Sequence, residues 1–444
     1  MKIQLSDHFT FRKLIKFTIP SIAMMIFTSI YGVVDGFFVS NFAGKVPFAA
    51  INLIMPVLMI FSTVGFMFGT GGSAIVAKTF GEGKNEKANE QFSLLVYVAF
   101  LLGVVISVFG NIFIRSIAKM LGAEGILLDN CVTYGRVILT VLPFYVLQLM
   151  FQSFFVTAEK PHLGLGVTVT SGVTNMVLDA ILVTLLPQEY KLIGAAIATG
   201  MSQVVGGVVP FVYFLRKNDS ILRLGKTSLD FGTISKACLN GSSEFMSNVS
   251  MSIVGMFYNI QLLKYAGENG VAAYGVMMYV SMIFSAAFIG YSIGTAPIVS
   301  YNYGAGNKKE LKGILRKSTT IICIFFLAMF LLAQVLANPL SDMFVGYDSQ
   351  LKELTQSGFR IFACSFLFMG VAIYSSAFFT ALNDGLTSAL ISFLRTLVFQ
   401  IIAIMVLPLI WGINGIWKSI VVAEVMAMIL SAIFIKIKRK KYGY

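Results

Sequence analysis

The sequence predicts an all-α integral membrane protein with twelve transmembrane helices, arranged in two six-helix bundles that are parallel repeats of each other. Three observations lead to this prediction: the composition, the succession of apolar stretches and an internal repeat. Of the 444 residues, 57% are hydrophobic and only 12% are charged, whereas about 25% of the residues in soluble domains are charged. This composition excludes a water-soluble fold.

Twelve apolar stretches are long enough to cross a bilayer, which takes about 20 residues. Most of the 33 Lys and Arg residues fall in the N-terminal segment, in every second loop and in the KIKRKK tail. Cytoplasmic loops carry such an excess, so we expect a multi-pass protein of the cell (plasma or inner) membrane with both termini in the cytoplasm. The predicted spans cover about 14–40, 47–77, 92–114, 132–157, 163–186, 192–215, 235–263, 270–300, 318–338, 356–381, 386–410 and 413–435.

An internal repeat relates the two halves of the chain. A shift of 223 residues lays GTGGSAIVAKTFGEGKNEKA over SIGTAPIVSYNYGAGNKKEL, and it pairs Gly71 with Gly294 and Gly81 with Gly304. A shift of 221 residues sets Pro187 over Pro408 further along. Six spans per half is an even number, so both halves insert with the same orientation, and a substrate path is expected between them.

The repeat divides the chain into three parts. We expect an N-terminal six-helix lobe over 1–215 and a C-terminal six-helix lobe with a basic cytoplasmic tail over 237–444. The basic and polar stretch 216–236 is the expected cytoplasmic linker between the lobes.

Ionisable side chains inside apolar spans are costly and often mark ion or substrate paths. Asp35 is the only charged residue between Lys16 and Lys45. Asn175 and Asp179 are four residues apart in SGVTNMVLDAIL, so they share one helical face. Their oxygens could coordinate a hard cation or share a proton. If Asp35 and Asp179 face each other in an apolar cavity, they cannot easily both ionise, which is the basis of a proton switch. The alternatives are a solvated Asp35 near the outer interface and a structural hydrogen bond for the pair on the fifth span.

The second half carries different polar groups. The repeat places Tyr258 opposite Asp35 and Gln400 opposite Asp179, so the acidic pair is not repeated. Each of the remaining charged candidates is the only charge in its apolar stretch, and a structural role is the alternative for each. A pairing of Glu244 with Arg395 is possible. They are Glu244, Arg395 and Glu424.

Aromatic, amide and Met side chains on the fourth and eighth spans are candidates for lining a substrate cavity. Such a stripe is also typical of helices that face lipid or the protein core. An apolar pocket of this kind would suit amphipathic organic cations, held by ring faces and carboxylates. The candidates are Tyr145, Gln148, Phe151, Gln152, Tyr274, Met277 and Met278.

Other classes of site are not indicated. The four Cys are scattered singly and the chain has two His, so neither a structural metal site nor a disulfide framework is expected. No P-loop, H-E-x-x-H or G-x-S-x-G motif occurs, and no glycine-rich dinucleotide fingerprint occurs in a strand-turn-helix setting. The net charge of +13 is spread between apolar spans, which argues against nucleic acid and suits membrane lipids as partners.

Several motifs together resemble the multidrug and toxic compound extrusion (MATE) family. They are Pro20 and Asp35 in IPSIAMMIFTSIYGVVDGFFVS, the glycine-rich end of the second span followed by GEGKNEKA, and NMVLDAIL in the fifth span. The segment NGSSE at 240–244, followed by FYNIQLLKYAGENGVAAYG, is similar to the MepA-like bacterial branch. The resemblance covers about 10–440.

This resemblance implies two bundles forming a V, and export of organic cations in exchange for H⁺ or Na⁺. It implies that Asp35, Asn175 and Asp179 match the family's cation site in the N-terminal lobe, with the Thr199 hydroxyl in GAAIATG beside it. The second half lacks the acids that another branch carries deeper in the seventh span and in the tenth, so Glu244 is the available substitute.

We therefore expect a monomeric secondary antiporter that exports hydrophobic cationic compounds or drugs by alternating access. The coupling ion, H⁺ or Na⁺, is the only cofactor expected.

The alternative within transport is a flippase for lipid-linked saccharides or precursors, which needs a basic cavity for pyrophosphate. A membrane-embedded enzyme is the alternative from another class, and no nucleophile–base or metal constellation supports it. The basic candidates for the flippase are Arg136, Arg360, Arg395 and Lys418.

Overall fold

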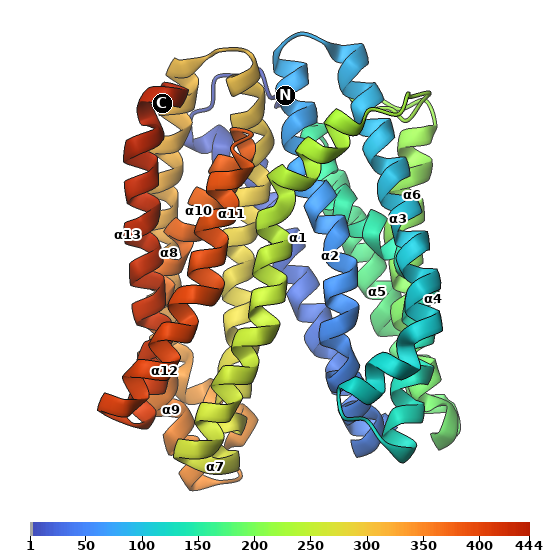
Figure 1. Ribbon diagram of the computed structural model, residues 1–444, viewed down its shortest axis with the longest axis vertical. Helices are drawn as coiled ribbons and strands as arrows, with labels where there is room; N and C mark the ends of the chain where they lie inside the picture. The colour runs from blue at the N-terminus through green and yellow to red at the C-terminus, as the bar shows by residue number, and fades with distance from the viewer. Residues whose placement is uncertain (1–2) are drawn as a thin grey trace.

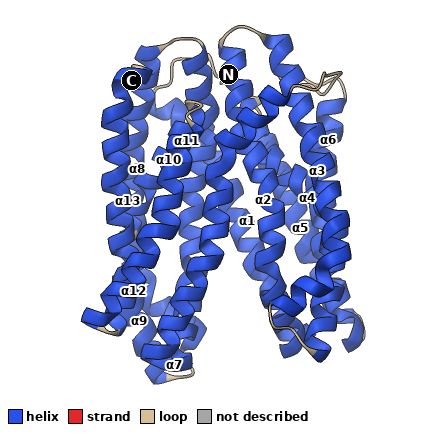
Figure 2. Ribbon diagram, in the orientation of Figure 1, coloured by secondary structure: helices blue, strands red, loops and turns tan. Residues whose placement is uncertain are grey.

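The computed structural model describes residues 3–444, and all regular elements in this range are helices (Figure 2). The first six spans form an N-lobe. Two of its helices start with residues that favour a helix N-terminus. The fifth helix has Pro in its first turn, and the Thr10 side chain accepts a hydrogen bond from Lys13 N at the start of the first helix. The helices are α1 (Phe11–Phe38), continued by a π-helical turn (Val39–Ala43), α2 (Lys45–Gly81), α3 (Asn85–Met120), α4 (Gly125–Thr157), α5 (Pro161–Leu185) and α6 (Lys191–Leu215), with a 3₁₀ turn at Gln188–Tyr190.

The C-lobe begins with α7 (Phe231–Gly304), which starts within the linker predicted over 216–236. Its 74 residues would be about 110 Å long as one straight helix. The chain instead reverses at Gly267, whose φ of 59° is left-handed, so α7 supplies two spans. The other helices are α8 (Lys308–Val345), α9 (Ser349–Ala363), α10 (Phe366–Ala381), α11 (Gly385–Phe393), a π-helical turn (Leu394–Val398), α12 (Phe399–Trp411) and α13 (Ile413–Tyr442).

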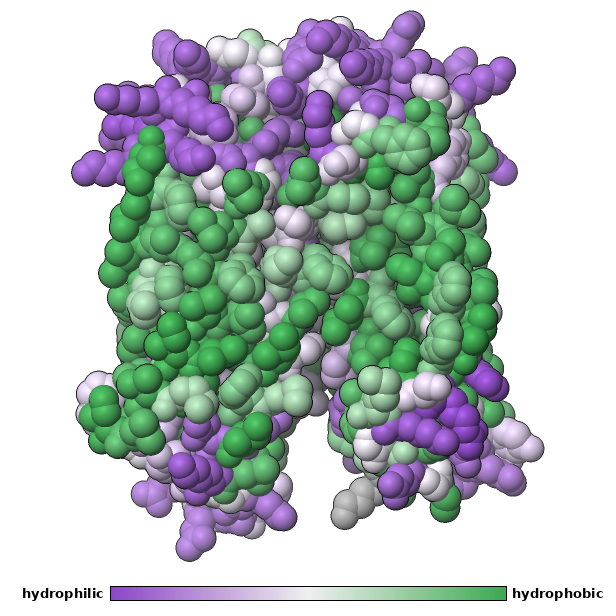
Figure 3. Space-filling view, viewed as in Figure 1, coloured by the Kyte–Doolittle hydropathy of each residue, from purple (hydrophilic) through white to green (hydrophobic). Residues whose placement is uncertain are grey.

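Counted as spans, these helices agree with the twelve predicted. Helices α9 and α10 meet at a bend of 48° and form one broken span. Helices α11 and α12, joined by the π-helical turn, form another. With α7 counted as two, each lobe has six spans. Figure 3 shows a green apolar belt between two polar ends, as expected for a protein in a bilayer.

The two lobes meet near the end of the molecule where both chain termini lie, and they diverge toward the far end (Figure 1). Figure 3 shows the cleft that opens between them there. We call these the termini end and the far end. The described structure therefore has the cleft open at the far end only.

Glycines allow the lobes to touch at the termini end. A Cβ on Gly81 would lie 2.0 Å from the Tyr301 carbonyl oxygen, and one on Gly304 would lie 2.0 Å from that of Lys78. These two contacts are related by the 223-residue repeat. Met67 and Gly241 are equally close, since a Cβ on Gly241 would lie 2.0 Å from the Met67 carbonyl oxygen. The backbones of α2 and α7 therefore pack without side chains between them.

The segment before α1 crosses from one lobe to the other at the termini end. In the N-lobe, Leu5 N donates to Glu159 Oε1 at 2.8 Å. In the C-lobe, Phe9 N donates to Glu310 Oε1 at 2.9 Å, and His8 Nδ1 lies 2.7 Å from Glu310 Oε2. Leu5 and Phe9 are fully buried. We call residues 3–10 the strap, because it is bound by both lobes.

Candidate functional site

The acids predicted in the N-lobe lie together among α1, α5 and α6. Thr199 Oγ1 donates to Asp35 Oδ1 at 3.3 Å. Asn175 and Asp179, one turn apart on α5, face the same Asp35 carboxyl group. Asp179 is fully buried and Asn175 nearly so, whereas Asp35 is half-buried. The structure thus brings together all four predicted residues, and their role in ion coupling stays a prediction.

The hydrogen bonds of this cluster are incomplete. Within residues 3–444, neither oxygen of Asp179 and neither polar atom of the Asn175 amide has a hydrogen-bond partner of good geometry. The neighbouring Asp35 carboxyl group can bond to Asp179 only if one of the two holds a proton. Two carboxylates, an amide oxygen and a hydroxyl are also ligands that a hard cation accepts. The cluster can therefore take up a proton or a cation.

Two tyrosines at the site were not predicted. Tyr31 lies one turn before Asp35 on α1, and it contacts Gln148 on α4. Tyr134, also on α4, is fully buried beside Thr199 and both acids. The i, i+4 spacing to Asp35 could have indicated Tyr31. No sequence signal could have found Tyr134, because its place depends on how α4 packs against α6.

The C-lobe residues that the 223- and 221-residue shifts set against Asp35 and Asp179 are also in contact, and their side chains are neutral. Tyr258 OH donates to Gln400 Oε1 at 2.9 Å, and both residues are buried. The Tyr274 ring stacks on Tyr258, with 5.0 Å between centroids and 4° between planes. The repeat therefore matches the acidic pair of one lobe with a neutral hydrogen bond in the other.

Arg395 pairs with Glu424, not with Glu244 as the sequence also allowed. Its Nε lies 2.8 Å from Glu424 Oε2 and its Nη2 lies 2.9 Å from Glu424 Oε1. Arg395 sits in the π-helical turn after α11, which aims its side chain at α13. Glu244 is half-buried, one turn along α7 from the crossing at Gly241, and no ion pair to it occurs within residues 3–444.

The residues predicted to line a cargo cavity have different surroundings. Phe151 is fully buried and stacks on Phe214 at 5.5 Å, inside the aromatic core of the N-lobe. Met277 is fully buried in the core of the C-lobe. Gln148 and Gln152 face a small internal cavity of the N-lobe. The three that keep some exposure are Tyr145, Tyr274 and Met278.

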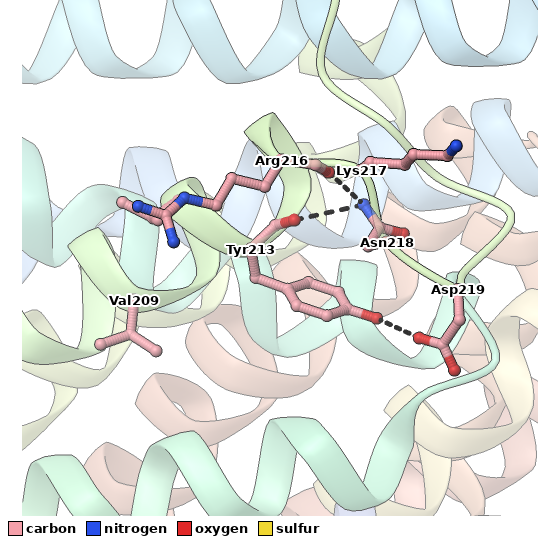
Figure 4. A pocket seen from close by; sticks show the side chains of 7 residues that line it. Val209, Tyr213, Arg216, Lys217, Asn218 and Asp219 are labelled. Atoms are coloured by element: carbon pink, nitrogen blue, oxygen red, sulfur yellow. Dashed lines mark hydrogen bonds between the residues drawn. The ribbon is translucent and has the colours of Figure 1, made fainter.

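A surface hollow of about 670 Å³ lies where α6 ends and the linker begins (Figure 4). Tyr213 OH donates there to Asp219 Oδ1 at 3.1 Å, and Asn218 Nδ2 donates to the Tyr213 carbonyl at 3.2 Å. None of the predicted site residues lines this hollow. We therefore do not assign it to cargo.

Comparisons with known proteins agree with the repeat and with the fold. A family model described as MatE matches the chain once in each half, over residues 20–181 and 245–406. Among curated relatives, the multidrug export protein MepA of Staphylococcus saprophyticus is 23% identical over 436 residues, covering 97% of this chain and 94% of its own. That of Staphylococcus haemolyticus is 24% identical over 426 residues, covering 95% and 92%.

Solved structures have the same fold. An outward-facing multidrug resistance MATE family transporter of the MOP superfamily superposes with a TM-score of 0.92 at 23% identity, covering 98% of this chain and 97% of that one. A MATE protein crystallised in complex with MaL6 gives 0.91 at 23% identity, covering 98% of each chain. The matched family model spans most of both lobes, and the chain belongs to the MatE family of membrane proteins.

Proposed function

We propose that this protein exports hydrophobic, cationic organic compounds from the cell in exchange for H⁺ or Na⁺. The observation that carries the proposal is the buried cluster of Asp35, Asn175, Asp179 and Thr199, which can take up one cation. The curated relatives named as multidrug export proteins support export of drugs. The excess of basic residues at the termini end supports a cytoplasmic location of that end, so the cleft would open to the outside.

Exchange follows from competition between two arrangements of the N-lobe. With both acids charged, repulsion and desolvation favour a hydrated, loosely packed cluster. A proton or Na⁺ arriving through the open cleft neutralises one charge, so α1, α5 and α6 can pack more closely. This repacking would release the cargo and let the lobes close at the far end. Loss of the cation on the cytoplasmic side resets the cluster.

The cargo site is proposed at the cleft, on the C-lobe side. Glu244 lies one turn from the place where α2 and α7 cross, and its carboxylate is not taken by an ion pair within residues 3–444. A cationic compound would supply the missing charge. The partly exposed Tyr274 and Met278 on the second arm of α7 offer an aromatic face and a flexible apolar contact.

A flippase for pyrophosphate-linked lipids is not favoured. Arg395 donates three hydrogen bonds to Glu424. Arg136 and Arg360 are exposed, and Lys418 Nζ lies 4.4 Å from the centroid of the Trp411 ring. The bases needed for a pyrophosphate are therefore neutralised or scattered.

The test is ethidium efflux from proteoliposomes with an imposed pH gradient, repeated with an imposed Na⁺ gradient. We expect one gradient to drive efflux, and Asp35→Asn and Asp179→Asn to slow it at least 100-fold. Tyr258→Phe is the matched control, because it changes the equivalent position in the C-lobe and removes only a neutral hydrogen bond. Its driven efflux should stay within about threefold of wild type.

Two results would overturn the proposal. One is gradient-driven efflux that persists in both acid variants. The other is absence of efflux under either gradient from protein whose melting curve shows that it is folded.

A further inference from the structure

An internal cavity lies in the N-lobe between α4, α5 and α6, closer to the termini end than the acids. It holds about 10 Å³, which is roughly the space of one water molecule. Its polar lining comes from Gln148, Gln152 and Thr168, and its apolar lining includes Phe151 and Phe155. The cavity is thus polar on one side and has the size of a single small ligand.

The two glutamines have unused hydrogen-bonding atoms. Gln152 is only 3% exposed, and within residues 3–444 neither its Oε1 nor its Nε2 has a partner. Gln148 is 4% exposed and its Oε1 also has no partner. A buried polar group left unpaired costs about 1–3 kcal/mol. Three such atoms beside one cavity therefore indicate a polar occupant.

The other lobe shows what fills the equivalent place. The turn between α4 and α5 and the turn between α10 and α11 each contain a non-glycine residue with a left-handed φ of 58°, Glu159 and Asn383. Aligning these two turns, a shift of 224 residues, sets Gly164 against Ser388. The C-lobe therefore has a hydroxyl where the N-lobe has a bare backbone.

That hydroxyl completes a closed network in the C-lobe. Ser376, the counterpart of Gln152, has its Oγ 2.8 Å from the Oγ of Ser388 and 2.8 Å from that of Ser392. Thr380 Oγ1 lies 2.7 Å from Ser388 Oγ. The side-chain hydroxyls there bond one another directly, and no buried oxygen among them lacks a partner.

We propose that the N-lobe binds one water molecule in this cavity, in the place of the Ser388 hydroxyl. The water donates to Gln148 Oε1 and accepts from Gln152 Nε2. It has the two or more polar partners that a buried water needs.

This water would act on the coupling site through Gln148, a step that rests on the proposed function. Gln148 Nε2 donates to Ser171 Oγ at 3.2 Å, and Ser171 Oγ donates to the Ser202 carbonyl at 2.7 Å. Gln148 also contacts Tyr31, one turn from Asp35. Ser171 lies one turn before Asn175 on the buried face of α5. Gln152 is therefore a positioning residue, which holds Gln148 through the water.

Hydroxyl-radical footprinting by X-ray radiolysis of the full-length protein tests the water site directly, because bound water labels the side chains beside it. We expect Phe155, which is 2% exposed, to be labelled at least five times faster than Phe92, which is fully buried away from the cavity. Gln152→Met, which keeps the volume and removes the polar atoms, should abolish that excess, and Gln152→Asn should keep it. Equal labelling of the two rings in wild type would overturn the proposal.

Ethidium transport then tests the positioning role. Gln152→Met should lower the maximal gradient-driven rate about three- to tenfold with an unchanged KM for ethidium, and Gln152→Asn should restore it. Ser376→Ala in the C-lobe is the control, and its coupled rate should not change. A rate in Gln152→Met equal to wild type would overturn the positioning role. Driven efflux retained in Asp35→Asn would refute the proposed function instead, while the labelling still decides on the water.

Discussion

The 223- and 221-residue shifts of the sequence repeat set Asp35 and Asp179 of one lobe against Tyr258 and Gln400 of the other, and the two pairs differ in chemistry. The neutral pair satisfies itself with one hydrogen bond of 2.9 Å. The acidic pair cannot do so unless a proton or cation is present. If the proposed function holds, ion dependence resides in the N-lobe alone and follows from two residues.

The ion pair of Arg395 and Glu424 gives a prediction about stability. Glu424 is 2% exposed, so Glu424→Gln leaves the guanidinium without its counter-charge. Breaking a buried pair in this way costs about 3–5 kcal/mol, whereas replacing both partners by apolar residues is often neutral. We expect Glu424→Gln to lower the melting temperature in detergent, and Arg395→Met with Glu424→Leu to recover most of the loss. A double variant that is less stable than the single one would contradict this account.

At the scale of elements, α2 and α7 can cross closely because glycines, which have no side chain, lie at the contact. We predict that Gly81→Ala forces the lobes apart at the termini end, because its Cβ would lie 2.0 Å from the Tyr301 oxygen. The cleft at the far end should then narrow. Spin labels at Met120 and Tyr347, both exposed at the far end, measure this change as a shorter distance.

A glycine elsewhere in α7 supplies the control for this experiment. Among the described residues 3–444, a Cβ on Gly275 meets no atom within 4 Å, so Gly275→Ala should leave the distance distribution as in wild type. A distribution in Gly81→Ala that superposes on wild type would show that the crossing tolerates a methyl group.

The docking of α13 against the turn before α11 predicts a dependence on pH. The pKa of Asp384 lies below its usual value, although burial of the carboxyl group raises it. The lowering comes from hydrogen bonds donated by Tyr442 and Thr387 and from the charge of Lys438. A lowered pKa stabilises the fold above the unfolded value of about 3.9, and this stabilisation is lost as the pH falls through the lowered value. Asp384→Asn should therefore lower the melting temperature at pH 7, and the difference should shrink below about pH 4. A difference that grows on acidification would contradict the prediction.

At the scale of the whole molecule, the strap binds both lobes at the termini end. We therefore predict that it favours the conformation that is open at the far end. Glu310 accepts from Phe9 N and lies 2.7 Å from His8 Nδ1. Hydrogen bonds to a charged group contribute about 1.5–3 kcal/mol each, so Glu310→Ala should raise the population closed at the far end at least tenfold. The same spin-label pair measures it. Lys312→Ala, an exposed change on the same helix, should have no effect, and an equal response of both variants would argue against the strap.

Most of the architecture could be predicted from the sequence, because apolar stretches and a 223-residue repeat are properties of the chain itself. The helical spacing of Asn175 and Asp179 likewise placed both on one buried face. What could not be predicted depends on packing between helices. The partner of Arg395 is an example, because the sequence suggested Glu244, whereas the π-helical turn aims the Arg395 side chain at Glu424 on α13.

The two contacts between Gly81 and Tyr301 and between Gly304 and Lys78 have the form of an isologous interface, in which each half offers the same patch. Two separate copies of one half would meet in the same way. The geometry is that of a homodimer joined into one chain, so fusion of duplicated genes would have required no new surface. It would also have allowed the two copies to differ at the positions of the acids.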